Sequence, residues 1–457
     1  MTKGKRRLVE WGKSLLIILL AGSALLLLGN TQLYANGAAA AGGNWFLTAL
    51  HTLPLWGQGE ETDSGWSGGT MVRPVRLVIT APQGRAGYQY DSEAVGNLFS
   101  ELTNTLADAL TSAGTPEETT AARFRAALRG KTPGVYLDFL GQLPLVNLSA
   151  WLNGGRAPAD LADTPVRRLV LTVTESGDVA LYYINEETGL YYVSKTSPDL
   201  AERLTLFAEE VSPNGAIFAF EAGKSYEVLD PYTLLSGGST PKLGAYQAFN
   251  PVSLTETGGS SEYGTAVDSL VRSLSFHPQS PSYRYGGGGG LAIQEGSEQL
   301  RISENGLVTF EAADLESPRF SLNRGKKLIS RGELVSGAWE FAERVLVPLC
   351  GEAGLYVMDV QENDSGSLIV LLGYQLDGAP VLVGREGYAA RLEIRNGSIT
   401  AFRMQLRSYV NQGTGVAVLP ELQATAALQK NGENGLELML CYPDAMGDSV
   451  TAQWGVF

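Results

Sequence analysis

One segment near the N-terminus restricts the topology of this chain more than any other. Ser14–Gly29, "SLLIILLAGSALLLLG", contains no charged residue. With its mildly polar continuation to Tyr34 it reaches the ~20 residues that cross a bilayer core of about 30 Å. The only dense basic run of the chain, Lys3–Arg7, precedes it, and the positive-inside rule then places the N-terminus in the cytoplasm. The sequence therefore predicts a cytoplasmic tail at 1–13, a single-pass cell-membrane anchor at 14–34 and an extracytoplasmic remainder.

Aromatic residues stand at both ends of this segment. Trp11 and Tyr34 are expected to be interface anchors, because amphipathic rings favour the membrane–water boundary. The alternative is a cleaved signal peptide, since the small residues of 34–43, "YANGAAAAGG", suit a signal peptidase. No cysteine follows the apolar run, which excludes a lipoprotein, and no second apolar segment is long enough to span. Both interpretations leave the bulk of the chain outside the cytoplasm.

The chain is acidic, with 34 Lys and Arg against 48 Asp and Glu and a formal net charge of −14. Nucleic-acid binding needs clustered basic residues, so no nucleic-acid partner is expected.

The two cysteines, Cys350 and Cys441, are too few for a disulfide-stapled domain. Both stand in apolar surroundings and are expected to be small buried side chains. Whether they pair is left open.

Composition and periodicity divide the remainder into a spacer and three α+β domains. A Gly- and Ala-rich linker is predicted at 35–70. The first domain, 71–235, should contain an amphipathic helix that begins after a capping residue, Asp91 or Ser92. Its second half, "VRRLVLTVTESGDVALYYINEETGLYYVS", predicts an antiparallel meander with turns at "ESGD" and "EETG".

The rest of the chain contains a weak internal repeat. The stretches 236–329 and 330–457 each start with an amphipathic helix and continue as a meander. Each meander contains an Asn-Gly pair, Asn305–Gly306 and Asn396–Gly397, which is the strongest short hairpin signal. We therefore expect two related α+β domains, each an antiparallel sheet flanked by a helix.

Five consecutive glycines, Gly286–Gly290, raise the question of phosphate binding. A Walker loop ends in Gly-Lys-Ser/Thr, and a dinucleotide fingerprint opens a helix. Here Gly290 is followed by "LAIQEG", which alternates as a strand does. The sequence predicts a turn between two strands.

Residues for catalysis are sparse. His51 and His277 are the only histidines, and they stand far apart, which does not suit a zinc site or a Ser-His-Asp triad. Asp138 and Asp359 lie on strand-like runs and are interpreted as outward-facing strand residues rather than a glycosidase pair. No catalytic, metal-binding or cofactor-binding residue is predicted.

Four tyrosines in "ALYYINEETGLYYV" allow two interpretations. Tyr182, Tyr183, Tyr191 and Tyr192 could form a platform on which a sugar stacks. Cross-strand pairing within a hairpin explains them equally well.

The layout resembles the YycH and YycI proteins of Gram-positive bacteria. The resemblance rests on the anchor, "EWGKSLLIILLAGSALLLLGNTQLY", and on "LLGYQLDGAPVLVGREGYAARLEIRNGSITAFRMQLRSY", which is similar to a family pattern G-Y-x-x-x-x-G-x-P-V followed by a strand, an Asn-Gly turn and a strand. "SYRYGGGGGLAIQEGSEQLRISENGLVTFEA" is similar to the equivalent part of the middle domain. It departs from the family pattern at the glycines.

The resemblance implies a regulatory function without catalytic residues. Proteins of this family are extracytoplasmic regulators of the WalK/YycG two-component system, which controls cell-wall metabolism. They associate with its sensor histidine kinase, in part through their membrane helices, and with each other. In this chain Gly22, Ser23 and Ala24 form a small-residue patch that would let two membrane helices approach closely. The alternative function is a cell-surface module that binds wall polymer or carbohydrate.

Overall fold

The computed structural model describes most of the chain after residue 71. The predicted tail, anchor and linker lie outside the described residues, together with Trp11, Gly22, Ser23, Ala24 and Tyr34. In the part that is described, no helix combines the length and apolarity needed to cross a membrane. The described residues are 72–154, 163–235, 243–252, 254, 265–286, 289–316, 318–323, 329–416, 418–429 and 435–457.

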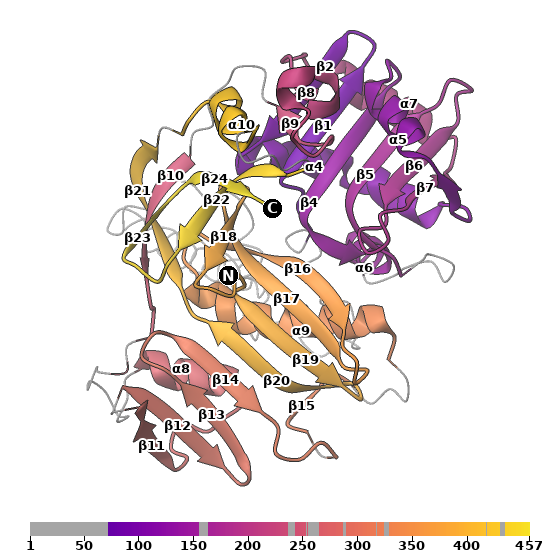
Figure 1. Ribbon diagram of the computed structural model, residues 1–457. Coiled ribbons are helices and arrows are strands. Elements are labelled where there is room, and N and C mark those ends of the chain that lie inside the picture. The colour runs from indigo at the N-terminus through magenta and orange to yellow at the C-terminus, as the bar shows by residue number, and fades with distance from the viewer. Residues whose placement is uncertain are drawn as a thin grey trace, which may run out of the picture. The chain divides into compact units, whose positions relative to one another are not determined.

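Seven antiparallel strands form a first sheet, in the order β2-β1-β4-β5-β6-β7-β3 (Figure 1). The meander predicted from the sequence is confirmed as its β5, β6 and β7, which pair antiparallel in succession. The strands are β1 Arg76–Ala81, β2 Gly84–Gln89, β3 Glu117–Thr119, β4 Gly134–Pro144, β5 Pro165–Val173, β6 Val179–Ile184 and β7 Tyr191–Lys195.

Helices cover both faces of this sheet. Leu77 and Ile79 of β1 pack with α4 (Ser92–Thr111), α6 (Leu145–Leu152) and α7 (Leu200–Glu209). Val78, between them in sequence, points to the opposite face and packs with Phe124 of α5 (Ala121–Arg129). Because successive side chains of a strand alternate between faces, strands covered in this way must be apolar on both sides.

A second sheet contains twelve strands. Its main path is β11-β12-β13-β14-β20-β19-β17-β18-β22-β24, with β15 paired to β20 and β16 paired to β17. Helices α8 (Thr265–Ser273) and α9 (Arg331–Leu346) belong to this part of the chain (Figure 1). The strands are β11 Ser282–Tyr285, β12 Gly290–Glu295, β13 Glu298–Ile302, β14 Leu307–Glu311, β15 Phe320–Ser321, β16 Gly354–Glu362, β17 Leu368–Leu376, β18 Ala379–Val383, β19 Ala390–Arg395, β20 Ser398–Gln405, β22 Leu438–Asp444 and β24 Gln453–Val456.

The two predicted repeat units share this sheet. Strand β14 of the first unit pairs antiparallel with β20 of the second, and the described residues belong to one compact unit. The structure therefore shows antiparallel α+β architecture, as expected, with strands from both stretches joined edge to edge. The repeat relation and the domain boundaries at 235/236 and 329/330 stay predictions.

Two local turn signals are confirmed. Asn305–Gly306 joins β13 to β14, and Asn396–Gly397 joins β19 to β20. Both residues of the second pair have positive φ, 50° for Asn396 and 76° for Gly397. This is the backbone conformation that a two-residue hairpin requires and that Asn and Gly adopt at least cost. The predicted cap of α4 is also confirmed, since the Asp91 carboxylate accepts a hydrogen bond from the Ala94 amide at 2.9 Å.

Smaller elements complete the described chain. Strand β10 (Leu243–Phe249) pairs with β21 (Ser408–Val416) and β23 (Ser449–Thr451), and β8 (Ile217–Phe218) pairs with β9 (Leu234–Leu235). The remaining helices are α10 (Glu421–Gln429) and the 3-10 turns η1 (Ala219–Glu221), η2 (Lys224–Tyr226) and η4 (Val347–Leu349).

Strand β4 of the first sheet lies directly against β16 of the second. The contact point is Gly141, where an added Cβ would stand 1.8 Å from the Val357 carbonyl oxygen. Strand β16 carries a bulge at this place, between Val357 and Asp359. The two sheets therefore meet backbone to backbone, at a distance that only glycine permits.

Candidate functional site

The four tyrosines of the predicted platform lie on two faces of the first sheet. Tyr183 and Tyr192 are cross-strand partners, stacked with their ring centroids 5.6 Å apart. Tyr182 and Tyr191 point to the other face and pack against Phe124 of α5. The rings therefore do not form one platform, and a ligand-binding role for either pair stays a prediction.

Asp138 corrects an expectation drawn from the sequence. It was expected to face outward from its strand, but its side chain is 1% exposed. Strand β4 has no solvent-facing side, because α4, α6 and α7 cover one face of the sheet and α5 covers the other. A carboxylate in the middle of such a strand is buried and needs charged partners.

Those partners form a buried ion cluster of three arginines and three carboxylates. Arg76 of β1, Asp138 of β4 and Arg168 of β5 are direct cross-strand neighbours in the sheet. Arg167 and Glu437 complete the core of the cluster, and Asp230 pairs with Arg168 at 3.3 Å. The three positive and three negative charges balance. The cluster consists of Arg76, Asp138, Arg167, Arg168, Asp230 and Glu437.

Charge-assisted hydrogen bonds saturate the two central carboxylates. Asp138 accepts from Arg76 at 2.6 Å and from Arg167 at 2.7 and 3.0 Å, and one of its oxygens also accepts from the Leu140 amide at 3.0 Å. Glu437 accepts from Arg167 twice at 2.6 Å, a bidentate pair, from Arg76 at 2.9 Å and from Arg168 at 3.1 Å. Such bonds are among the strongest that side chains form.

These contacts lower the pKa of both carboxyls. Burial alone would raise the pKa of Glu437, but the charges of Arg167 and Arg76 outweigh it and hold the pKa well below its ordinary value. The pKa of Asp138 is lowered against burial by the same two arginines. Both groups are therefore ionised at neutral pH, whereas a general acid needs a raised pKa. The cluster is built to hold chain segments together, and it is unsuited to proton transfer.

The cluster ties the C-terminal segment to the first sheet. Glu437 is far from its partners in sequence, and its neighbours bond to the same region. The Asp230 amide donates to the Leu436 carbonyl at 2.7 Å, and the Leu440 amide donates to the Tyr90 hydroxyl oxygen at 2.9 Å. The strand β22 that follows Glu437 is part of the second sheet. The ion cluster thus links the two sheets of the molecule.

Stability is expected to fall on acidification because of this cluster. A carboxyl whose folded-state pKa lies below its unfolded value contributes stability that is complete above the unfolded pKa, about 4, and is lost as pH falls through the folded pKa. Denaturation midpoints should be flat from pH 7 to about 5 and should fall below about pH 4. Glu437→Gln should reduce that slope. An unchanged slope would contradict the assignment. Glu343, whose pKa burial raises, titrates alike in the wild type and the variant, so the comparison removes its contribution. Glu186 interacts with Glu437 and the cluster arginines, so its titration belongs to the measured difference.

A second polar network surrounds the motif that carried the family resemblance. Asp377, in the turn between β17 and β18, accepts hydrogen bonds from the hydroxyls of Tyr442 at 2.6 Å and Tyr246 at 2.9 Å, and from the Gly244 amide at 3.0 Å. Tyr374 of the same motif is fully buried, and its hydroxyl donates to the Gln405 carbonyl. The motif residues therefore have structural roles at the junction of β10, β17 and β22.

Two antiparallel strands flank the glycine run, as predicted. Strands β11 and β12 pair antiparallel up to Tyr285 and Gly290, on either side of it. Gly287 and Gly288 lie outside the described residues. His277 is an exposed loop residue whose Nδ1 accepts from the Gln279 amide at 3.2 Å.

The remaining chemical candidates are partly or fully buried. Asp359 is a half-buried residue of β16 whose carboxylate accepts from the Val360 amide at 2.8 Å. Cys350 and Cys441 are buried and unpaired, which confirms them as small buried side chains, and burial raises the pKa of each thiol to about 11. Over the described ranges, no group of three or more His, Cys, Asp and Glu side chains is placed to hold a metal ion.

The ion cluster was not predicted from the sequence, although the sequence places some of its charged residues inside apolar strands. Asp138 stands within the apolar run "VYLDFL", and Arg167 and Arg168 open the strand "VRRLVLTV". A charge inside an unbroken apolar strand indicates a strand buried on both faces, and such a charge must be paired. The partner Glu437 carries no such signal, because its pairing depends on how the chain folds.

The fold was compared with known proteins. No protein-family model matches the chain, and no curated protein matches it. The crystal structure of YycH from Bacillus subtilis aligns with it at a TM-score of 0.51 and 13% sequence identity, over 85% of this chain and 94% of YycH. The chain has the fold of YycH. The resemblance predicted from the sequence is thereby confirmed for the fold, and the alignment with YycH extends over most of both chains.

Proposed function

We propose that this chain is an extracytoplasmic regulator that binds and modulates a sensor histidine kinase of a cell-wall two-component system. The observation that carries the proposal is the alignment with YycH over 85% of this chain. The sequence adds a basic tail and one apolar segment, 14–34, which would anchor the protein in the membrane with residues 35–457 outside. A paralogous YycH- or YycI-type protein is the second partner that we propose.

In this proposal the chain acts on the kinase through contact. The buried carboxylates Asp138 and Glu437 are fully paired and ionised, and they serve to join the two sheets. A regulator changes the activity of a kinase only if it binds the two signalling states of that kinase with unequal affinity. Couplings of this kind are typically about 1–3 kcal/mol, which is within reach of a membrane helix contact combined with a domain contact.

A membrane-helix exchange tests the proposal. Replacing residues 8–34 with an unrelated membrane helix should abolish regulation of the kinase, measured as phosphorylation of its response regulator in cells. Replacing each of Gly22, Ser23 and Ala24 by leucine in one variant should also weaken regulation, because bulky side chains separate packed membrane helices. The matched control is Ile17→Leu with Ile18→Leu, which keeps the segment apolar and leaves the small residues in place.

Two results would count against the proposal. Unchanged kinase output after the helix exchange would show that the membrane-helix contact does not contribute to regulation. Retention of the 71–457 fragment on purified cell wall, together with failure of the full chain to co-purify with the kinase, would favour the polymer-binding alternative.

A further inference from the structure

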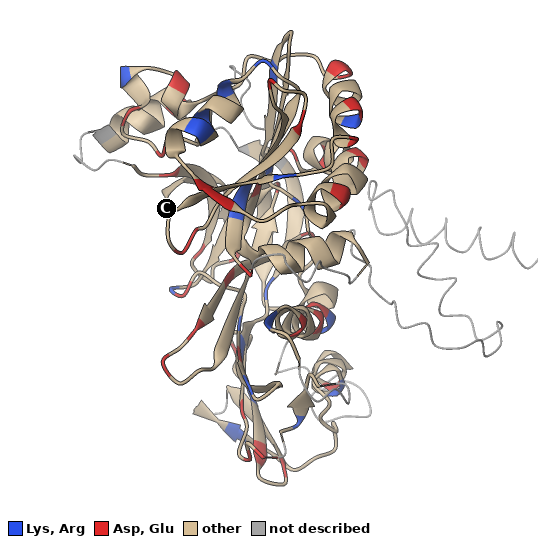
Figure 2. Cartoon of the chain, turned by 90° about the vertical axis from the view of Figure 1, so that its right-hand side faces the viewer, with Lys and Arg blue, Asp and Glu red and all other residues tan. Residues whose placement is uncertain are grey.

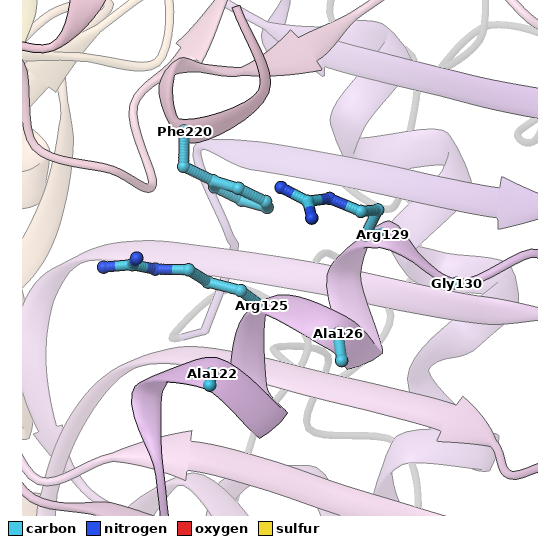
Figure 3. A pocket seen from close by; sticks show the side chains of 6 residues that line it. All are labelled: Ala122, Arg125, Ala126, Arg129, Gly130 and Phe220. Atoms are coloured by element: carbon cyan, nitrogen blue, oxygen red, sulfur yellow. The ribbon is translucent and has the colours of Figure 1, made fainter. Parts of the chain in front are cut away.

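An open pocket lies between helix α5 and the 3-10 turn η1, on the face of the first sheet opposite α4. Its volume is about 510 Å³, within the range of small-ligand sites. Figure 3 shows Arg125 and Arg129 extending from α5 on the side where Phe220 projects from η1. The lining residues are Ala122, Arg125, Ala126, Arg129, Gly130 and Phe220.

The helix builds this wall by its periodicity. Phe124 and Leu128, four residues apart, are buried against the sheet. Ala122, Arg125, Ala126 and Arg129 follow at spacings of three, four and seven, so they share the adjacent side of the helix. The small side chains of Ala122 and Ala126 beside the two arginines leave the room that the pocket occupies.

Both guanidinium groups lie beside the Phe220 ring. The Cζ of Arg129 lies 5.2 Å from the Phe220 ring centroid, and the Cζ of Arg125 lies 6.0 Å from it. Arg125 is also 5.9 Å from the ring of Tyr232. Stacking on aromatic rings orients a guanidinium while its N–H groups stay available to a ligand.

The pocket carries excess positive charge in an acidic protein, whose Asp and Glu residues lie on helices, strands and loops of the described chain (Figure 2). Within the described ranges, no salt bridge joins Arg125 to a carboxylate, and the side chain that its guanidinium bonds is the uncharged Tyr232. Arg129 lies 4.0 Å from Glu221, but that carboxylate is already held through both oxygens by Arg85. Counting Arg85, Arg125 and Arg129 against Glu221 leaves two positive charges, whereas the whole chain has a net charge of −14.

We propose that this pocket binds a phosphate group. One guanidinium group can occupy both oxygens of a carboxylate, as Arg85 does for Glu221. A carboxylate ligand would therefore satisfy one of the two pocket arginines and leave the other without an acceptor. A phosphate monoester presents three peripheral oxygens and close to two negative charges, which match two guanidinium groups. The group could belong to a soluble ester or to a lipid headgroup. This site is independent of the proposed kinase contact.

Binding is tested on the full chain in a phosphate-free, non-ionic detergent. Glycerol phosphate is titrated as the soluble probe, phosphatidic acid in mixed micelles as the lipid probe and acetate as the carboxylate probe, with calorimetry as the measurement. We expect saturable binding of at least one phosphate probe with a dissociation constant of about 1 mM or lower. The two phosphate arms identify the source of the group.

Matched variants locate the site. Arg125→Gln with Arg129→Gln should weaken phosphate binding about tenfold or more, because two charge-assisted interactions are lost. Arg123→Gln removes the same charge from an exposed position of the same helix and should stay within about twofold of wild type. Equal weakening by Arg123→Gln, equal affinity for acetate, or no saturable phosphate binding below about 10 mM would each overturn the proposal. Circular dichroism of each variant confirms that its fold is retained.

Discussion

Glu437→Gln is expected to lower the free energy of unfolding by about 3–5 kcal/mol, because it leaves a buried positive charge without its partner. Glu437 accepts four hydrogen bonds from three arginines, and its side chain is 9% exposed. Glutamine keeps the shape of the glutamate side chain but offers only one acceptor oxygen. Its NH2 group would face the Arg167 guanidinium, so two hydrogen-bond donors would oppose each other. Chemical denaturation followed by tryptophan fluorescence measures the change.

The matched control is Glu362→Gln at the end of β16. Glu362 is exposed, and no ion pair connects it to another described residue. Its replacement should change stability by no more than about 0.5 kcal/mol. If both variants were equally stable, the ion cluster would not be the link between the two sheets.

Gly141→Ala is expected to destabilise the chain by roughly 3 kcal/mol or more, because the new methyl group cannot be accommodated. An ideal Cβ at Gly141 would stand 1.8 Å from the Val357 carbonyl oxygen and 2.9 Å from the Met358 Cα. These are backbone atoms of β16, so no side chain can rotate away. The variant must separate β4 from β16, and thermal unfolding should show a lowered or divided transition.

Gly96→Ala is the control for this change. Gly96 lies within α4, and an added Cβ would meet nothing within 4 Å. Alanine should raise stability by up to about 1 kcal/mol through its higher helix propensity. A neutral Gly141→Ala variant would show that β4 and β16 do not meet as closely as described.

Local elements could be predicted because their signals are local. The Asn396–Gly397 pair fixes a hairpin by its tolerance of positive φ, and Asp91 fixes a helix start through one hydrogen bond to Ala94. The alternation after Gly290 predicted a strand, and that strand, β12, pairs with β11. Each of these depends on residues only a few positions apart.

Asp138 shows where such prediction fails. The run "VYLDFL" gave its position on a strand but not whether that strand has a solvent-facing side. That depends on α5 and on the segment at Glu437, which together cover the second face of the sheet. The four tyrosines are a similar case, since alternation separates Tyr182 from Tyr183 but only packing shows that Phe124 covers one of the two faces.

The sequence alone determined the antiparallel α+β elements, their turns and caps, and a fold that resembles YycH, because periodicity and turn chemistry are written in neighbouring residues. Only the tertiary structure decided that Glu437 meets Arg76 across 361 positions, that Gly141 marks the contact between the sheets, and that Phe220 stands beside two arginines of α5. These pairings join residues whose separation along the chain carries no pattern, and they form because burying charge or backbone requires a specific partner at that place.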